Sequence, residues 1–160
     1  MRYFIIIALI FLDQFTKYLV VNGLKYKDSI DIVPSILRLD YVENTGAAFG
    51  IMKDAQMIFI IITITFLIMA VIYYEKEIKQ QKNRMYNIIY ILILAGAIGN
   101  LIDRVVNKYV VDFISFYVIN YPVFNIADSF ICIGCVLLGV MVIMNPESRA
   151  TQRGERHERV

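Results

Sequence analysis

Four long apolar stretches dominate the chain, and each is long enough to cross a membrane as a helix. They lie at about residues 3–22, 55–74, 85–104 and 123–144, and a spanning helix needs about 20 mostly apolar residues. The first stretch begins like a secretory signal, but no small-residue cleavage site follows it, which indicates a retained helix. The pattern therefore predicts an all-α membrane protein with four transmembrane helices.

The connections between these helices differ in character. The link over residues 75–84 is short and basic, whereas those over 23–54 and 105–122 carry V-P-S-I-L-R-L-D-Y-V and K-Y-V-V-D-F-I-S-F-Y-V. Such β-branched and aromatic runs favour short strands or segments lying on the membrane. Lys and Arg gather before the first helix, in the short link and after the last helix, which predicts cytoplasmic termini, with the tail over 145–160 flexible and cytoplasmic.

Composition supports one integral-membrane domain over residues 1–160. The chain is 59% hydrophobic and 19% charged, and its net charge of +2 is too small to suggest a nucleic-acid surface. The single histidine, His157, lies in the polar tail, so a histidine triad or histidine metal site has nothing to be built from. We therefore expect no metal and no cofactor, and Cys132 and Cys135, within an apolar run, are expected to serve packing.

Polar residues of three predicted helices converge at one depth, near the outer ends of the helices. A charged group inside a spanning segment costs roughly 2.5 to 3.5 kcal/mol, so each one needs a partner or a function. Solvated charges would spread to both faces of the membrane, so their convergence indicates a functional site. The residues concerned are Asp13, Lys17, Asn100, Asp103, Arg104, Asn125 and Asp128.

Several of these groups also have a purely structural explanation. Asp13 and Lys17 stand at i and i+4 and can neutralise each other on one helix face. Asp103 is followed by Arg104, so an exposed pair at the interface is expected there. Asp128 differs, because it has no basic neighbour within a helical turn and lies in an apolar helix. Its carboxylate must be matched by a group from elsewhere in the fold.

The reactive groups at this depth are carboxylates, amides, one lysine and one arginine, which favours aspartic proteolysis. Two carboxylates close together cannot both ionise comfortably, so one keeps a proton and the other acts as a base on water. Asp128 is one candidate, and its partner is either Asp103 or Asp112. The adjacent Arg104 would hold Asp103 ionised, which favours Asp112, although spacing alone does not choose.

Two other functions compete with this interpretation. A Ser-Lys peptidase would use Lys17 as a desolvated base with Ser115 or Ser129 as the nucleophile. A small four-helix transporter would use Asp13, Lys17 and Asp128 as an intramembrane relay. A transporter should carry polar residues toward both faces or an internal repeat, and the sequence has neither.

Five motifs together carry a family resemblance. They are D-Q-F-T-K (13–17), N-T-G-A-A-F-G (44–50), G-A-I-G-N-L-I-D-R (96–104), V-V-D-F (110–113) and F-N-I-A-D (124–128). In this order the chain resembles lipoprotein signal peptidase, also called signal peptidase II. The resemblance implies a small extracytoplasmic β cradle around residues 32–42. It also implies an aspartic endopeptidase of the bacterial cytoplasmic (inner) membrane that cuts prolipoproteins just before the diacylglyceryl-modified cysteine.

The resemblance also implies roles for individual residues. It makes Asp112 and Asp128 the catalytic pair, and Asp13 and Lys17 supporting residues. It implies membrane lipids and globomycin-type cyclic peptide inhibitors as further partners, and an active site near the extracytoplasmic face. The connection between Asp112 and Asn125 is slightly compact for the family. The residues that the resemblance assigns to the substrate site are Asn44, Gly46, Asn100, Arg104 and Asn125.

Overall fold

Four long helices and a small sheet make up the fold. The computed structural model describes residues 1–46, 55–81, 83–119 and 121–144. The predicted tail over 145–160 and the end of the N-T-G-A-A-F-G motif lie outside the described residues. In chain order the elements are α1 (Arg2–Leu24), β1 (Ile30–Val33), β2 (Leu37–Asn44), α2 (Gln56–Tyr73), η2 (Tyr74–Ile78), η3 (Lys79–Gln81), α3 (Arg84–Val106), β3 (Val110–Phe116), η4 (Tyr117–Ile119) and α4 (Ile126–Met144).

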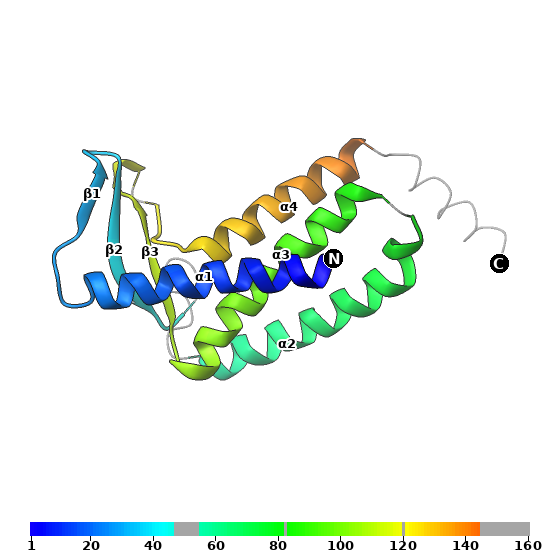
Figure 1. The fold of residues 1–160 in the computed structure, drawn as a ribbon, viewed down its shortest axis with the longest axis horizontal. Coiled ribbons are helices and arrows are strands. Elements are labelled where there is room, and N and C mark those ends of the chain that lie inside the picture. The colour runs from blue at the N-terminus through cyan, green and yellow to red at the C-terminus, as the bar shows by residue number, and fades with distance from the viewer. Residues whose placement is uncertain (47–54, 82, 120, 145–160) are drawn as a thin grey trace.

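The helices lie lengthwise beside one another, and the sheet closes one end of the bundle (Figure 1). Among the described residues, four helical segments are long and apolar enough to cross a membrane, and they include all of α1, α2, α3 and α4. The predicted fold class, four transmembrane helices with a small β element, is confirmed.

Helix α4 begins at Ile126 rather than at residue 123, because the residues before it pair with β3. The Phe124 N–H donates to the Ile114 carbonyl at 3.1 Å, and the Phe124 carbonyl accepts from the N–H groups of Phe113 and Ile114. This pairing keeps the chain extended up to the start of the helix. As a result, Asp128 lies in the first turn of α4, directly beside the sheet.

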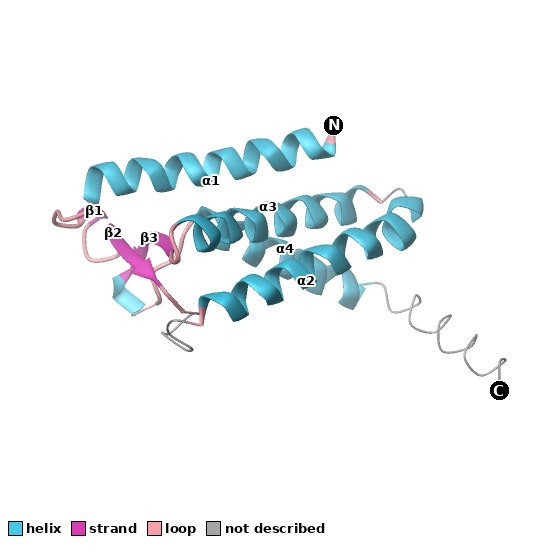
Figure 2. Ribbon diagram, turned by 90° about the horizontal axis from the view of Figure 1, so that it is seen from below, coloured by secondary structure: helices cyan, strands magenta, loops and turns pink. Residues whose placement is uncertain are grey.

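Helix α3 is the most buried of the four helices, and α1, α2 and α4 all contact it (Figure 2). Its glycines allow this close approach: a Cβ on Gly96 would lie 2.4 Å from the Ala127 carbonyl oxygen, and one on Gly99 would lie 2.6 Å from Asp13 Oδ2. Helix α2 has no buried residue and is apolar along its length. In a bilayer its side chains therefore face mainly lipid.

The sheet has strand order β1-β2-β3, and both pairings are antiparallel. Glu43 pairs with Val111 and Asn44 pairs with Val110, so the end of β2 lies beside the start of β3. Alternation along β3 sends Val111 and Phe113 into a cluster with Val20 and Leu24 of α1. Asp112, between them, points to the opposite face.

We expect Gly96→Ala to destabilise the contact between α3 and α4. The added methyl group would meet the Ala127 carbonyl oxygen and the Ile131 Cγ1 atom, at 2.4 and 2.7 Å, so the helices must move apart. Overpacking of this kind lowers the free energy of unfolding by about 1–3 kcal/mol. Thermal unfolding of the purified protein in detergent measures the effect as a lower Tm.

Gly139→Ala is the matched control, because nothing lies within 4 Å of its Cβ position in the same helical environment. Its only expected effect is the gain in helix propensity of about 1 kcal/mol. Equal Tm values for the two variants would contradict the close approach of α3 and α4 at Gly96.

Candidate active site

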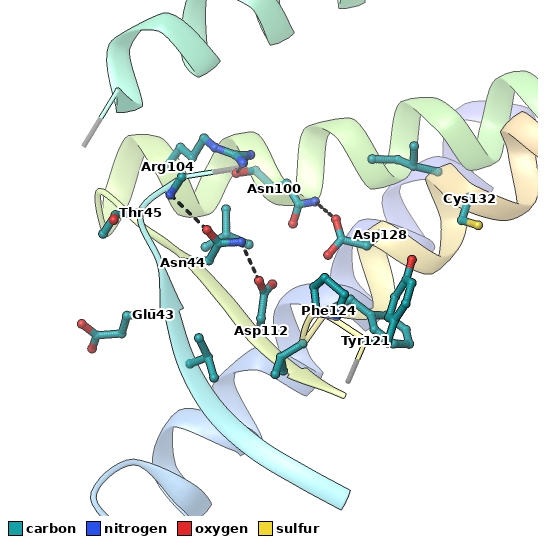
Figure 3. A pocket seen from close by; sticks show the side chains of 16 residues that line it. Glu43, Asn44, Thr45, Asn100, Arg104, Asp112, Tyr121, Phe124, Asp128 and Cys132 are labelled. Atoms are coloured by element: carbon teal, nitrogen blue, oxygen red, sulfur yellow. Dashed lines mark hydrogen bonds between the residues drawn. The ribbon is translucent and has the colours of Figure 1, made fainter. Parts of the chain in front are cut away.

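Asp112 and Asp128 line the same cavity at the sheet end of the bundle (Figure 3). The cavity has a volume of about 630 Å³. Asp112 reaches it from β3, and Asp128 reaches it from the first turn of α4. Its other lining side chains include Asn44, Asn100, Arg104, Tyr121 and Phe124.

Asn125 joins the two carboxylates. Its Nδ2 donates to Asp112 Oδ1 at 2.7 Å, and its backbone N–H donates to Asp128 Oδ2 at 3.2 Å. In return, the Asp128 N–H donates to Asn125 Oδ1 at 2.9 Å, so the two residues cap the start of α4 reciprocally. Asn125 is fully buried. It therefore fixes the position of one carboxylate relative to the other.

Asn44 holds the second oxygen of Asp112. Its Nδ2 donates to Asp112 Oδ2 at 2.8 Å, and its own Oδ1 accepts the N–H of Gly46 at 3.0 Å. The Gly46 contact determines which end of the amide faces Asp112. Both oxygens of Asp112 thus accept hydrogen bonds from neutral amides.

Asn100 does the same for Asp128. Its Nδ2 donates to Asp128 Oδ1 at 2.7 Å, while its Oδ1 accepts from Lys17 Nζ at 3.0 Å and from Asn125 Nδ2 at 3.1 Å. The lysine therefore orients the amide that holds Asp128, without contacting the carboxylate itself through a hydrogen bond in the described structure.

Lys17 is buried between two carboxylates. Its Nζ lies 2.9 Å from Asp13 Oδ2 and 2.9 Å from Asp103 Oδ2. The expectation that Asp103 forms an exposed pair with Arg104 is wrong, because Asp103 is buried and its partner is Lys17 of another helix. Asp103 also accepts the N–H of Val111 at 3.1 Å, which ties α3 to β3.

Asp13 has a second role beyond its pairing with Lys17. Its Oδ1 accepts the N–H of Ala127 at 2.9 Å, so α1 supplies a carboxylate to the N-terminal turn of α4. Gln14 was not singled out from the sequence, yet its Nε2 lies 3.2 Å from both Asp13 Oδ2 and Asp103 Oδ1. Its position beside Asp13 in D-Q-F-T-K was the available signal.

Arg104 lines the same cavity as Asp112 and Asp128, but among the described residues it forms no ion pair within 4.0 Å with either carboxylate. Its guanidinium carbon is 5.3 Å from the ring centroid of Phe59 on α2, and within the described part of the chain its only hydrogen bond is a long one, 3.5 Å, to the Asn100 carbonyl. The guanidinium is thus held near the cavity with donors to spare. Phe59 is a second residue that the sequence did not indicate.

Burial raises the pKa of Asp112 from 3.8 to about 7. The negative charge of Asp128 adds to this increase, whereas the hydrogen bonds from Asn44 and Asn125 and the charge of Lys17 oppose it. A carboxyl group with this pKa is partly protonated near neutral pH. One of two neighbouring carboxyl groups can therefore hold a proton while the other is ionised.

Two serines and two cysteines complete the set of residues that the sequence analysis named. Ser129 Oγ donates to the Asn125 carbonyl, Ser115 is buried, and the described structure gives Lys17 no hydrogen bond to either serine. Cys132 and Cys135 are both free and exposed, so the expectation that they serve interior packing is wrong. Cys132 lines the cavity.

Known proteins resemble this chain over most of its length. The family model described as signal peptidase (SPase) II matches residues 5–144. A lipoprotein signal peptidase of Caldanaerobacter subterraneus is 45% identical over 140 residues, covering 87% of this chain and 93% of the relative. A lipoprotein signal peptidase of Halalkalibacterium halodurans is 43% identical over 143 residues, covering 88% of this chain and 90% of the relative.

Two solved structures share the fold. Both are described as bacterial membrane enzymes, determined by the in meso method at 2.3 and 1.9 Å resolution. The first has a TM-score of 0.85 and 36% identity, and covers 92% of this chain and 90% of its own. The second has a TM-score of 0.79 and 38% identity, with 88% and 91% covered.

These matches confirm the resemblance inferred from the five motifs and favour peptidase activity over the transporter alternative. The chain is a multi-pass membrane peptidase that removes signal peptides from lipoprotein precursors, and it belongs to the signal peptidase II family.

Proposed function

We propose that Asp112 and Asp128 form the catalytic pair that activates water for this cleavage. The observation that supports the proposal most directly is that Asn125 contacts both carboxyl groups at the edge of one cavity. The protonated member polarises the scissile carbonyl, and the ionised member takes a proton from the attacking water. The base then passes that proton to the leaving nitrogen as the C–N bond breaks, which gives a free carboxyl group and a free amine without a covalent intermediate.

The substrate that we propose is a prolipoprotein carrying a diacylglyceryl group on the cysteine that follows the cut. The spanning helices meet the sheet at one end of the bundle (Figure 1), and the cavity is lined by residues of both, polar and apolar. A lipidated cysteine stays at the membrane surface, where both water and hydrocarbon are available. The cavity's polar and aromatic lining fits both parts of such a substrate.

In this proposal the sheet and the cavity face the outside of the bacterial inner membrane, and both termini face the cytoplasm. The start of α1, with Arg2, and the connection from α2 to α3, with Lys76, Lys79 and Arg84, lie at the end of the bundle away from the sheet (Figure 1). Basic residues in short connections favour the cytoplasmic side. A globomycin-type cyclic peptide is the class of inhibitor that we expect to occupy the cavity. Asn44, Asn100, Arg104 and Asn125 would line its binding site.

Replacing either aspartate, by Asp112→Asn or Asp128→Asn, should lower kcat by about 100-fold or more, because the pair then lacks either its base or its exchangeable proton. The measurement is cleavage of a lipidated precursor by the purified protein in detergent, with thermal unfolding to check that each variant is folded.

Asp28→Asn is the control for this experiment, because Asp28 is exposed and lies between α1 and β1. Its activity should equal that of the wild type. Asp103→Asn is unsuitable as a control, since Asp103 is buried against Lys17. Normal turnover by a folded Asp112→Asn or Asp128→Asn variant would rule out the catalytic pair.

The activity should fall as the pH rises through about 7. The pKa of Asp112 is raised to about 7, so below this pH the pair keeps one proton, and above it both carboxyl groups become ionised. Well above pH 7, kcat should decrease about tenfold per pH unit. A pH profile of kcat tests this, and a constant kcat from pH 6 to pH 9 in protein that remains folded would contradict the prediction.

Cleavage should require the lipid on the precursor. We expect turnover of a diacylglyceryl-modified precursor, at least about tenfold slower turnover of the same precursor without lipid, and inhibition of the first reaction by a globomycin-type peptide. The tenfold figure corresponds to about 1.4 kcal/mol of lost transition-state binding. Equal kcat/KM values for the two precursors would show that the lipid is not recognised.

A further inference from the structure

A second cavity, of about 460 Å³, lies between α2, α3 and α4, toward the end of the bundle away from the sheet, where α2 connects to α3 (Figure 1). It shares no lining residue with the candidate active site. Ligand pockets typically measure about 300–1,000 Å³, so this one is large enough to hold a ligand. Its lining residues include Phe66 of α2, Ile78 of η2, Gln81 of η3, Tyr90 of α3 and Leu138 of α4.

The cavity is accessible from the surface of the bundle that faces lipid. Helices α2 and α4 each pack on α3, and α2 has no buried residue. Phe66 and Leu138, which line the cavity, are 40% and 38% exposed. In a bilayer such surfaces contact acyl chains, because the hydrocarbon core holds no water. A ligand that reaches this cavity through the membrane is therefore a lipid or an apolar helix.

One lining side chain has a buried polar atom without a hydrogen-bond partner. Tyr90 is 7% exposed, and within the described part of the chain its hydroxyl forms no hydrogen bond. Tyr74, whose ring stacks on Tyr90, differs, because its hydroxyl accepts from Arg2 and donates to Asn87. Buried polar groups are nearly always paired. The Tyr90 hydroxyl therefore indicates a ligand that offers an acceptor oxygen, such as a carboxylic ester.

Positive charge gathers at the same end of the bundle. The connection over residues 75–84 carries four basic and two acidic residues. Both ion pairs that the described residues form at this end use Glu75. Lys76 and Arg84 are exposed and belong to neither pair. The connection therefore has positive charge available for an anion.

Arg84 stands directly beside the cavity, at the first position of α3. It lies in the chain between Gln81 and Tyr86, both of which line the cavity. The first turn of α3 contains no acidic residue, although the N-terminus of a helix favours negative charge and disfavours a cation. A phosphate bound here would be attracted by both the guanidinium and the start of the helix. The position thus fits an anionic headgroup.

We propose that this cavity binds an anionic glycerophospholipid of the membrane. One acyl chain lies between α2 and α4, an ester oxygen accepts from the Tyr90 hydroxyl, and the phosphate contacts Arg84. Basic pockets between transmembrane helices on the cytoplasmic side bind such headgroups. The site goes beyond the cleavage reaction, because neither residue lines the candidate active site. In the topology proposed above, the lipid belongs to the inner leaflet.

The chemistry of the site distinguishes this lipid from the two parts of the substrate. A signal peptide begins with a positively charged region, which the basic connection around Arg84 would repel. A diacylglyceryl group carries esters but no charge, so it matches Tyr90 and not Arg84. An anionic phospholipid offers both the ester oxygen and the negative charge.

Native mass spectrometry of the purified protein tests the site with two lipids that have the same acyl chains, anionic phosphatidylglycerol and zwitterionic phosphatidylcholine. In the wild type, Kd for phosphatidylglycerol should be at least about fivefold lower. Arg84→Gln should remove most of this preference. Lys27→Gln, which removes an exposed cation between α1 and β1, is the matched control and should keep it.

Two further variants test the parts of the ligand that both lipids share. Tyr90→Phe should raise Kd about fivefold for either lipid, the loss expected for one hydrogen bond. Leu138→Trp narrows the cavity and should also weaken both lipids. Tyr18→Phe and Val140→Trp alter exposed residues outside the cavity, so they should leave both Kd values unchanged.

Equal Kd values for the two lipids in the wild type would overturn the site, as would a folded Arg84→Gln variant that keeps the full preference. A Tyr90→Phe variant with a higher Tm without lipid and unchanged Kd values would also overturn it, because the hydroxyl would then be only an unsatisfied group. Binding is measured without substrate, so failure of the proposed catalytic pair would leave these results intact.

Discussion

The buried ammonium group of Lys17 is the interaction on which the geometry of the site depends. An isolated charge in a spanning helix is expensive, and a buried ion pair is tolerable only when its remaining hydrogen-bonding capacity is satisfied. Asp13 and Asp103 match the charge; the N–H of Ala127 donates to the other oxygen of Asp13, and the N–H of Val111 donates to the Asp103 oxygen that also pairs with Lys17. Because these partners come from four elements, α1, α3, β3 and α4 are fixed relative to one another.

In the described structure Lys17 has no direct hydrogen bond to the proposed catalytic pair, and its hydrogen bonding reaches the pair through an amide. Lys17 donates to Asn100 Oδ1, and it is the other end of this amide that holds Asp128. A lysine placed directly on the pair would favour two ionised carboxylates and lower their affinity for protons. Neutral amides from Asn44 and Asn125 hold Asp112 in place while burial keeps its pKa near 7. Neutral amides thus hold the two carboxyl groups in position, and the positive charge of Lys17 is neutralised by other carboxylates.

The sheet and the bundle contribute one carboxylate each. Alternation along β3 packs Val111 and Phe113 on α1 and turns Asp112 to the other face, while the pairing of Phe124 with Ile114 starts α4 at a point that puts Asp128 opposite. The same junction brings the first turn of α2 to Arg104. A helix that otherwise faces lipid thus acquires a contact with the cavity.

Much of this was predictable from the sequence because it depends on local pattern. Apolar runs of membrane length predicted the four helices, and β-branched runs predicted strands near the outer ends. The depth of each polar residue followed from the helical rise, so the convergence of Asp13, Asn100 and Asp128 could be expected. Motif order supplied the family.

Partner choice was not predictable, because it depends on which helix faces meet. Sequence adjacency suggested Arg104 for Asp103, whereas packing of α1 on α3 gave it Lys17. Gln14 and Phe59 carry no charge and match no chemical motif, so only their neighbours in space reveal them. The sequence by itself determined the helices, their polar depth and the family. The tertiary structure decided which side chains share a hydrogen bond, because contacts between residues far apart in the chain depend on rotation and close approach of the helices.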